Sequence, residues 1–110
     1  MKITKKDTFT LISSDENSFR EFYESFLQKE KEFKNEHLVL EISEKINPNT
    51  EDFLLFLSIA HRKQQNGTSF VIIKSNVNVD NFPEDFNIVP TLIEAEDILE
   101  MEAIERELGF

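Results

Sequence analysis

Short apolar runs alternate along the chain with longer stretches in which apolar side chains recur at helical spacing. Three of the runs predict β-strands, at residues 8–12, 38–42 and 70–73. The second and third runs are almost continuously apolar, as in strands that are covered on both faces. A brief edge strand is predicted at Ile88 and Val89. The pattern therefore favours a small sheet of about four strands.

Two helices are predicted between these strands. The first covers residues 18–33, because one face carries apolar side chains and Ser18 with Glu21 makes a capping box. The second starts at Asn49 or Thr50, ends before Gly67, and is almost wholly apolar in its middle. We expect its apolar side chains to be buried against the strands at 38–42 and 70–73: Phe53, Leu54, Phe56 and Leu57.

A last helix is predicted from Thr91, which makes a capping box with Glu94, to Leu108, with a possible bend near Glu100. Its apolar positions at helical spacing are Leu92, Ala95, Ile98, Leu99, Met101, Ile104 and Leu108. A single helical turn is predicted at 83–86. Two consecutive strand–helix–strand units imply right-handed crossovers and a mixed sheet. We therefore expect one α/β sandwich domain over residues 1–110.

The net charge of -10 is concentrated at one end of the chain. Residues 1–79 hold 12 acids and 11 bases, whereas residues 80–110 hold 10 acids and a single base, Arg106. Such a surface repels phosphate backbones and anionic membranes, so we expect neither nucleic acid nor membrane as a partner. A basic protein partner would suit it, although the simpler explanation of the charge is that it aids solubility.

Composition and short motifs limit where in the cell the protein is expected and which kinds of functional site it can have. Apolar runs are shorter than the ~20 residues of a membrane span, and the first residues lack the apolar stretch of a signal peptide. With no cysteine as well, we expect a cytoplasmic protein. Two isolated histidines, His37 and His61, form no metal-binding motif. With only two glycines, the chain has neither a dinucleotide-binding fingerprint nor a P-loop. Because no motif for a metal, a cofactor or a catalytic site is present, we expect a protein that is not an enzyme and holds neither metal nor cofactor.

The loop before the central helix is the most informative segment. Residues 47–52 read Asn-Pro-Asn-Thr-Glu-Asp, which places a hydroxyl at a helix N-terminus directly after a buried strand. A phosphate on Thr50 would meet free backbone N–H groups, and also the negative charges of Glu51 and Asp52. The alternative is purely structural: Asn49 caps the helix, Thr50 is its first residue, and Asp52 completes a capping box.

Four segments together resemble the STAS domain, the anti-sigma factor antagonist family. They are HLVLEIS at 37–43, NTEDFLL at 49–55, NGTSFVII at 66–73 and VPTLIEA at 89–95. In that family a strand leads to a loop with an Asp-Ser-Ser-Gly-like motif, followed by an apolar helix, a glycine turn and a strand. The resemblance covers about two-thirds of the chain and implies a STAS-like fold, with one clear N-terminal strand where the family usually has two.

The resemblance also implies a function and a site. A STAS-like protein would be a non-catalytic interaction module in partner-switch regulation, with an anti-sigma factor or a kinase as its partner. The candidate phosphoacceptor falls on Thr50, and the partner-binding loop on Asn47, Asn49, Thr50, Glu51 and Asp52. The loop departs from the family motif, because Asn49 replaces Asp, Glu51 replaces the second Ser and Asp52 replaces Gly.

Two alternative functions stay open. Short acidic bacterial chains of this type also resemble proteins that carry the name ribonuclease Z, so an accessory role in RNA processing is one alternative. That enzyme, however, is a much longer hydrolase whose metal ligands come from a His-x-His-x-Asp-His motif, which His37 and His61 cannot supply. The other alternative is a structural remnant that keeps the fold and has lost the switch.

Overall fold

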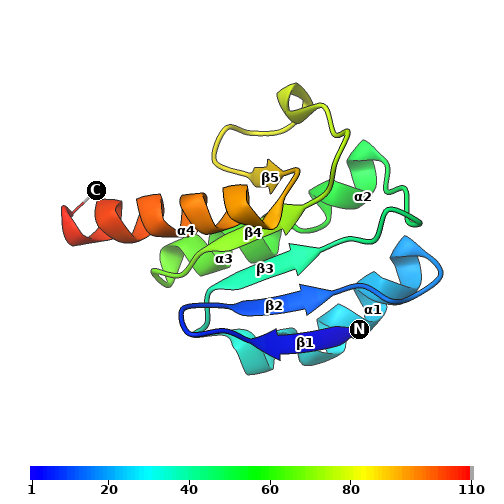
Figure 1. Ribbon diagram of the computed structural model, residues 1–110, viewed down its shortest axis with the longest axis horizontal. Helices are drawn as coiled ribbons and strands as arrows, with labels where there is room; N and C mark the ends of the chain where they lie inside the picture. The colour runs from blue at the N-terminus through cyan, green and yellow to red at the C-terminus, as the bar shows by residue number, and fades with distance from the viewer. Residues whose placement is uncertain (110) are drawn as a thin grey trace.

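Five strands form one mixed sheet in the order β1-β2-β3-β4-β5 in the computed structural model, which describes residues 1–109. β1 pairs with β2 in the antiparallel sense, and β2 to β5 run parallel to one another (Figure 1). The expected mixed α/β fold is confirmed, with five strands instead of about four. The strands are β1 Lys2–Lys5, β2 Thr10–Ser13, β3 Leu38–Glu41, β4 Phe70–Ile73 and β5 Asn87–Val89.

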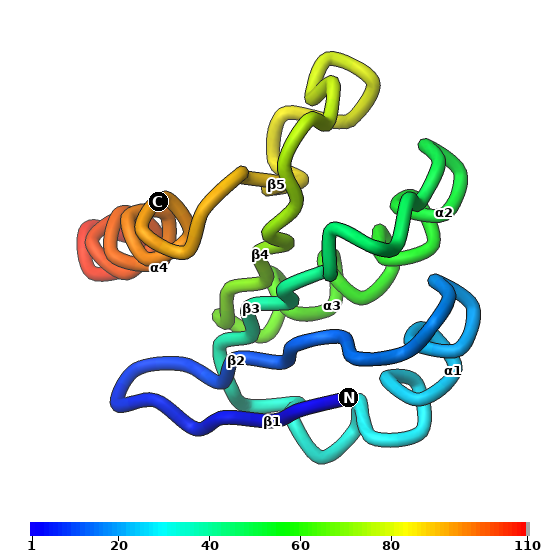
Figure 2. Tube along the Cα trace, turned by 45° about the vertical axis from the view of Figure 1, so that its right-hand side comes forward, coloured from blue at the N-terminus to red at the C-terminus, as the bar shows by residue number. Residues whose placement is uncertain are grey.

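Helices lie on both sides of this sheet (Figure 2). One side carries α1 Phe19–Lys29, the 3₁₀ helix η1 Glu30–Phe33, α2 Thr50–Leu54 and α3 Leu57–Gln65. The other side carries only α4 Leu92–Glu107, which packs on β4 and β5. A further 3₁₀ helix, η2 Val79–Asn81, precedes the predicted turn at 83–86, which a hydrogen bond from the Phe86 N–H to the Pro83 carbonyl closes.

The alternation of side chains along β3 and β4 divides the interior into two cores. Leu38 and Leu40 of β3, with Ile72 of β4, point into the core under α1, α2 and α3. Val39 and Val71 point into the core under α4. Both strands are thus covered on both faces, as their continuous apolar character predicts.

The N-terminal part has two strands, so the expectation of a single strand there was wrong. β1 was missed because its sequence, Lys-Ile-Thr-Lys, has one apolar residue and no alternation that indicates a buried face. Its register places Lys2 opposite Ser13 and Lys5 opposite Thr10, at the edge of the sheet. Lysines on an edge strand are a common protection against pairing with another chain, which explains why the strand looks like a polar loop in sequence.

The central apolar segment is two helices and not one. The Leu55 N–H bonds to the Asp52 carbonyl and the Phe56 N–H to the Phe53 carbonyl, so the chain tightens into i→i−3 bonds between α2 and α3. Side chains three apart share a face in that conformation, and both Phe53 and Phe56 are therefore buried. Leu54 and Leu57 are only half-buried, so the prediction of their burial was wrong.

The last helix is continuous from Leu92 to Glu107, and the bend considered near Glu100 does not interrupt it. Ala95 and Leu99 are buried against the sheet, with Leu92 and Ile98 beside them. The later apolar positions, Met101, Ile104 and Leu108, are exposed instead of continuing the buried stripe, because they lie on the side of α4 opposite Ala95 and Leu99. The C-terminal end of α4 also projects past the ends of the strands (Figure 1).

Candidate functional site

The loop from β3 to α2 is held in one shape although most of its side chains face solvent. Ile46 is buried in the core under α2, and its N–H donates to the Ser43 carbonyl at 3.0 Å. The Ser43 N–H in turn donates to the Ser14 hydroxyl at 2.7 Å, which ties the loop to the end of β2. This anchoring fixes the position at which residues 47–52 leave the sheet.

A capping box starts α2. The Asn49 side chain accepts a hydrogen bond from the Asp52 N–H at 2.8 Å, and the Asp52 carboxylate accepts one from the Asn49 N–H at 3.1 Å. Thr50 is the first residue of α2, and its hydroxyl takes no part in the box. The structure thus brings the five sequence-predicted residues into one segment, in which Asp52 is half-buried and the others are exposed: Asn47, Asn49, Thr50 and Glu51.

A buried lysine lies beside this loop, and sequence reasoning missed it. Lys74 follows β4 directly, is 6% exposed, and places its Nζ 3.0 Å from the Glu44 carboxylate. The Ser75 hydroxyl donates to the same carboxylate at 2.8 Å. Hydrogen bonds from Lys74 first, and from Ser75 second, hold the pKa of Glu44 below its usual value. The signal in the sequence was a lysine directly after an apolar strand.

This ion pair joins the ends of two neighbouring parallel strands. Glu44 comes shortly after β3 and Lys74 directly after β4, so their contact fixes the two loops at the carboxyl edge of the sheet. A small hollow of about 130 Å³ lies between them, lined in part by Asn47, Pro48 and Phe53. In open α/β sheets, ligands bind outside the carboxyl ends of the strands, which is the edge where this hollow lies.

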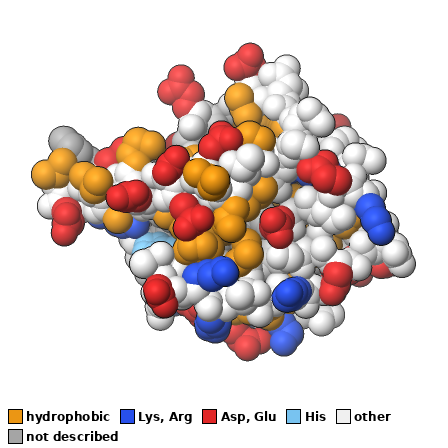
Figure 3. Space-filling model, in the orientation of Figure 1, with side chains coloured by type: hydrophobic (Ala, Val, Ile, Leu, Met, Phe, Trp, Pro, Cys, Tyr) orange, Lys and Arg blue, Asp and Glu red, His pale blue; other side chains and the backbone are white. Residues whose placement is uncertain are grey.

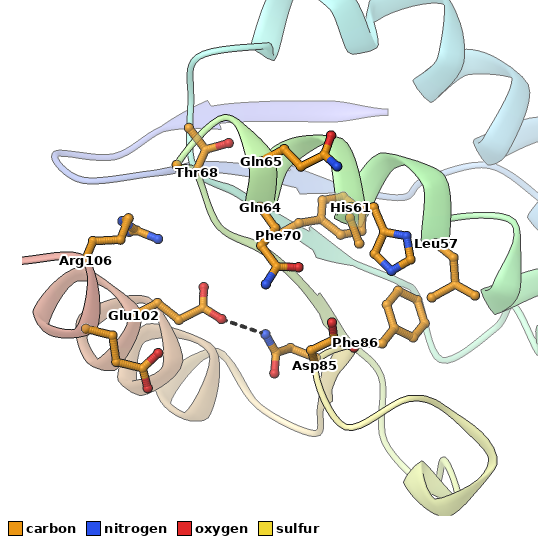
Figure 4. A pocket seen from close by; sticks show the side chains of 14 residues that line it. Leu57, His61, Gln64, Gln65, Thr68, Phe70, Asp85, Phe86, Glu102 and Arg106 are labelled. Atoms are coloured by element: carbon orange, nitrogen blue, oxygen red, sulfur yellow. Dashed lines mark hydrogen bonds between the residues drawn. The ribbon is translucent and has the colours of Figure 1, made fainter. Parts of the chain in front are cut away.

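A larger cleft, with a cavity volume of about 330 Å³, lies between α3 and α4 (Figure 4). Its apolar lining comes from Leu57, Phe70 and Phe86, and its polar lining includes His61 and Asp85. Figure 4 shows side chains from α3 on one side of the cleft and side chains from α4 on the other. This cleft was not predicted, because its two walls are far apart in sequence.

Polar groups of the cleft tie α4 to the sheet. Glu102 accepts hydrogen bonds from the Ser69 hydroxyl at 2.6 Å and from the Asn87 side chain at 3.1 Å, the latter drawn in Figure 4. The Arg106 guanidinium donates to the Ser69 hydroxyl at 3.2 Å. The Thr68 hydroxyl donates to the Lys63 carbonyl at 3.0 Å. These groups are paired with one another or with the backbone, and the bonds to Ser69 and Asn87 hold α4 against the sheet.

The two histidines lie in different parts of the structure and do not form one site. His37 precedes β3, and its Nδ1 accepts a hydrogen bond from the Ser69 N–H at 2.9 Å. Burial lowers the pKa of His37, and the charges of Arg106 and Lys63 lower it further. His61 is exposed on α3. Among residues 1–109, no group of three or more histidine, aspartate or glutamate side chains is placed to hold a metal ion.

None of the helices that the structure describes between residues 1 and 109 combines the length and the apolar character that crossing a membrane requires.

The fold is similar to that of a STAS-domain chain in a solved structure, described as "Molecular architecture of the stressosome, a signal integration and transduction hub". The TM-score is 0.58, and the similarity covers 93% of this chain and 98% of that chain at 19% sequence identity. No family model matches the sequence, and no curated protein matches it. The STAS-like fold expected from the sequence is therefore confirmed by the structure alone.

Proposed function

We propose that the protein is a non-catalytic interaction module that binds a protein partner through the loop around Thr50. The observation that carries this proposal is an exposed segment whose backbone is held in one conformation. Asn47, Asn49, Thr50 and Glu51 face solvent, while buried Ile46 and the capping box hold their backbone in place. A surface that is already ordered loses little conformational entropy on binding, which favours recognition by a partner.

The partner that suits this module is a regulatory protein of the anti-sigma factor or kinase type, in bacterial partner-switch signalling in the cytoplasm. Similarity to a chain of the stressosome, a signal integration and transduction hub, supports a role in protein assembly. The hydrogen bonds in the cleft between α3 and α4 also favour an interaction module over an enzyme. Glu102 and Thr68 of this cleft hold structural elements together.

Thr50 is the proposed site of regulation by phosphorylation. Its hydroxyl is free of the capping box, so a phosphate there would leave the start of α2 intact. A helix of five residues has a weak dipole, and its attraction for phosphate, about 0.3 kcal/mol at an exposed site, is opposed by like charges on Glu51 and Asp52. Phosphorylation would therefore change what the loop binds and leave the stability of the domain nearly unchanged.

Affinity capture of the tagged protein from its own cell extract tests the proposal, followed by titration of the recovered partner against purified protein. Wild type is compared with Thr50→Ala, Thr50→Glu and, as a control at an exposed threonine elsewhere, Thr8→Glu. We expect one stoichiometric regulatory partner whose binding Thr50→Glu weakens and Thr8→Glu does not. Mass spectrometry of protein from native cells then shows whether Thr50 carries phosphate.

Three results would count against the proposal. Recovery of no stoichiometric partner at physiological salt would favour the structural remnant. A partner that binds wild type, Thr50→Ala and Thr50→Glu equally well, with no phosphate on Thr50, would move the binding surface away from this loop. Cleavage of a tRNA precursor by the purified protein, dependent on added zinc, would instead support the alternative role in RNA processing.

A further inference from the structure

An apolar stripe runs along the outer side of α4. Ile93, Met101, Ile104 and Leu108 are 72%, 53%, 52% and 66% exposed, and their spacing places them on one side of a helix. The large hydrophobic side chains that are exposed elsewhere lie singly on α1, between α2 and α3, and in η2. Figure 3 shows hydrophobic side chains along the projecting part of α4, with acidic side chains beside them. Met101, Ile104 and Leu108 follow one another at helical spacing, whereas Ile93 lies two turns earlier with the exposed Asp97 in between. Exposed apolar side chains grouped in this way mark interaction sites in soluble proteins.

Contacts on the opposite side of α4 fix this stripe toward solvent. Ala95 and Leu99 are buried against the sheet, and Glu102 and Arg106 continue the same side through their hydrogen bonds with Ser69. These four positions recur at helical spacing and lie on the side of the helix opposite the stripe. Rotation that buried Met101 and Ile104 would break the bonds of Glu102 and Arg106, so the helix holds its apolar stripe outward.

Acidic side chains border the stripe without compensating bases. Glu96, Asp97, Glu100, Glu105 and Glu107 are all exposed on α4. Arg106 is the single base of this helix, and it points to Ser69 on the sheet side. Within residues 1–109, none of the ion pairs involves a residue of α4. The negative charge along the stripe is thus left for a binding partner to neutralise.

We propose that this stripe is a second docking surface, and that it takes a basic amphipathic helix of a partner protein. An apolar face of that helix would pack on Ile93, Met101, Ile104 and Leu108, and lysine or arginine side chains on its flanks would pair with the acids of α4. Helix-on-helix docking of this kind buries apolar anchors and uses charge to select the partner. The surface is separate from the loop around Thr50, and the proposal does not depend on it.

Charge argues against a second copy of this chain as the occupant. Two copies packed stripe to stripe would bring the acids of one α4 against those of the other, in parallel and in antiparallel orientation alike. Arg106 is committed to Ser69 and is the single base that each α4 could offer. Like charges brought together across an interface cost binding free energy, whereas a basic helix gains from the same acids.

The test titrates the full-length protein with three synthetic peptides of the length of α4. One has leucine at every third or fourth position and lysine elsewhere, the second has glutamate in place of lysine, and the third keeps the lysines but has glutamine in place of leucine. Binding is measured by calorimetry, and the surface is mapped by NMR of backbone amides. We expect the leucine–lysine peptide alone to bind well, with the largest shifts along α4 and an affinity that falls as salt rises.

Paired variants assign the binding to the stripe. The double variant Met101→Ser, Ile104→Ser should bind the leucine–lysine peptide about tenfold more weakly, because two apolar anchors are lost. The control Leu27→Ser, Val79→Ser, which removes two exposed apolar side chains elsewhere, should bind as wild type does. Glu100→Gln with Glu105→Gln should also weaken binding, whereas Glu32→Gln with Glu84→Gln should not. Circular dichroism confirms that each variant is folded.

Three outcomes would overturn the proposal. Equal weakening by the stripe variant and its control would show nonspecific attraction to an acidic protein. Amide shifts centred on the loop around Thr50 would assign the binding to that loop. Concentration-dependent dimerisation in sedimentation experiments that Met101→Ser, Ile104→Ser abolishes would make a second copy the occupant. Loss of binding at the Thr50 loop, by contrast, leaves these measurements unaffected.

Discussion

The core under α1, α2 and α3 is packed with phenylalanine, whereas the core under α4 is mainly aliphatic and has a single helix above it (Figure 2). On the first side seven of the fifteen buried members are phenylalanine: Phe22, Phe26, Phe33, Phe53, Phe56, Phe70 and Phe86. On the second side Phe9 is the one phenylalanine among six buried members. One sheet thus supports a thick aromatic layer and a thin aliphatic layer.

This difference separates the side that contributes most of the core from the side that carries the proposed docking surface. Phe56 contacts four aromatic rings at centroid distances of 5.4 to 6.0 Å, so the thick side is a connected network in which each ring supports the others. The apolar core of the thin side uses only the first half of α4, where Ala95 and Leu99 are buried, while Glu102 and Arg106 attach the second half through hydrogen bonds. The outer side of α4 is not packed against the sheet, so it can carry charged and exposed apolar side chains without disturbing the core.

The largest effect is expected at the centre of the thick side. Phe56→Ala removes a fully buried ring and its four aromatic contacts, and should lower the free energy of unfolding by about 3–5 kcal/mol. Chemical denaturation measures this loss. Leu57→Ala is the matched control. The Leu57 side chain, next to Phe56 in the chain, is only half-buried, so its truncation should cost only about 1–2 kcal/mol. Equal losses would mean that the chain does not turn between α2 and α3.

The second effect tests the thin side. Leu99→Ala removes the largest buried side chain that α4 contributes, and should cost about 2–3 kcal/mol, at the low end of leucine truncations because the site lies near the rim of the core. Ile104→Ala on the outer side of the same helix is the control and should change stability by less than about 0.5 kcal/mol. A Leu99→Ala loss as large as that of Phe56→Ala would contradict the contrast between the two sides.

Local patterns in the sequence predict the parts of this fold that are decided locally. The apolar runs at β3 and β4 predicted buried strands, and Ser18, Asn49 and Thr91 each cap the helix that the pattern indicated. Each of these features depends on neighbours within a few residues, so it is visible without knowledge of the fold. The capped loop at residues 47–52 could therefore be located in advance.

Features that depend on distant contacts could not be predicted. β1 exists because β2 pairs with it, although its own residues lack a strand pattern. Lysine is a surface residue by default, yet Lys63 is buried with its Nζ 2.9 Å from the Phe33 carbonyl, and burial lowers its pKa. The ion pair of Lys74 with Glu44 and the cleft between α3 and α4 likewise join segments that the chain order separates.

A third, smaller effect compares two neighbouring residues of the candidate site. Asn49→Ala removes the side-chain acceptor for the Asp52 N–H and should destabilise the protein by about 1 kcal/mol. Thr50→Ala changes an exposed hydroxyl outside the capping box and should change stability by less than about 0.5 kcal/mol. Thermal unfolding of both variants measures the difference. A larger loss for Thr50→Ala would mean that Thr50 has a structural role, which would weaken its assignment as a switch.

The smallest effect is a pH dependence at the junction of the two sides, where His37 accepts a hydrogen bond from the Ser69 N–H. Burial, and then the positive charges of Arg106 and Lys63, lower the pKa of His37 in the folded protein. The unfolded chain therefore binds a proton more readily, and stability should fall as pH drops below about 6.5, the ordinary histidine pKa, toward the lower folded value. Above that window the contribution is constant.

Replacement of the two histidines isolates this dependence. His37→Asn keeps an acceptor for the Ser69 N–H and removes the titrating group, so the slope of unfolding free energy below about pH 6.5 should flatten. His61→Asn alters an exposed histidine on α3 and should leave the slope as in wild type. The carboxylates with lowered pKa, among them Glu36 and Glu44, lose their contribution only at more acidic pH. If the unfolding free energy of His37→Asn keeps the same pH dependence as wild type, a group other than His37 is responsible for it.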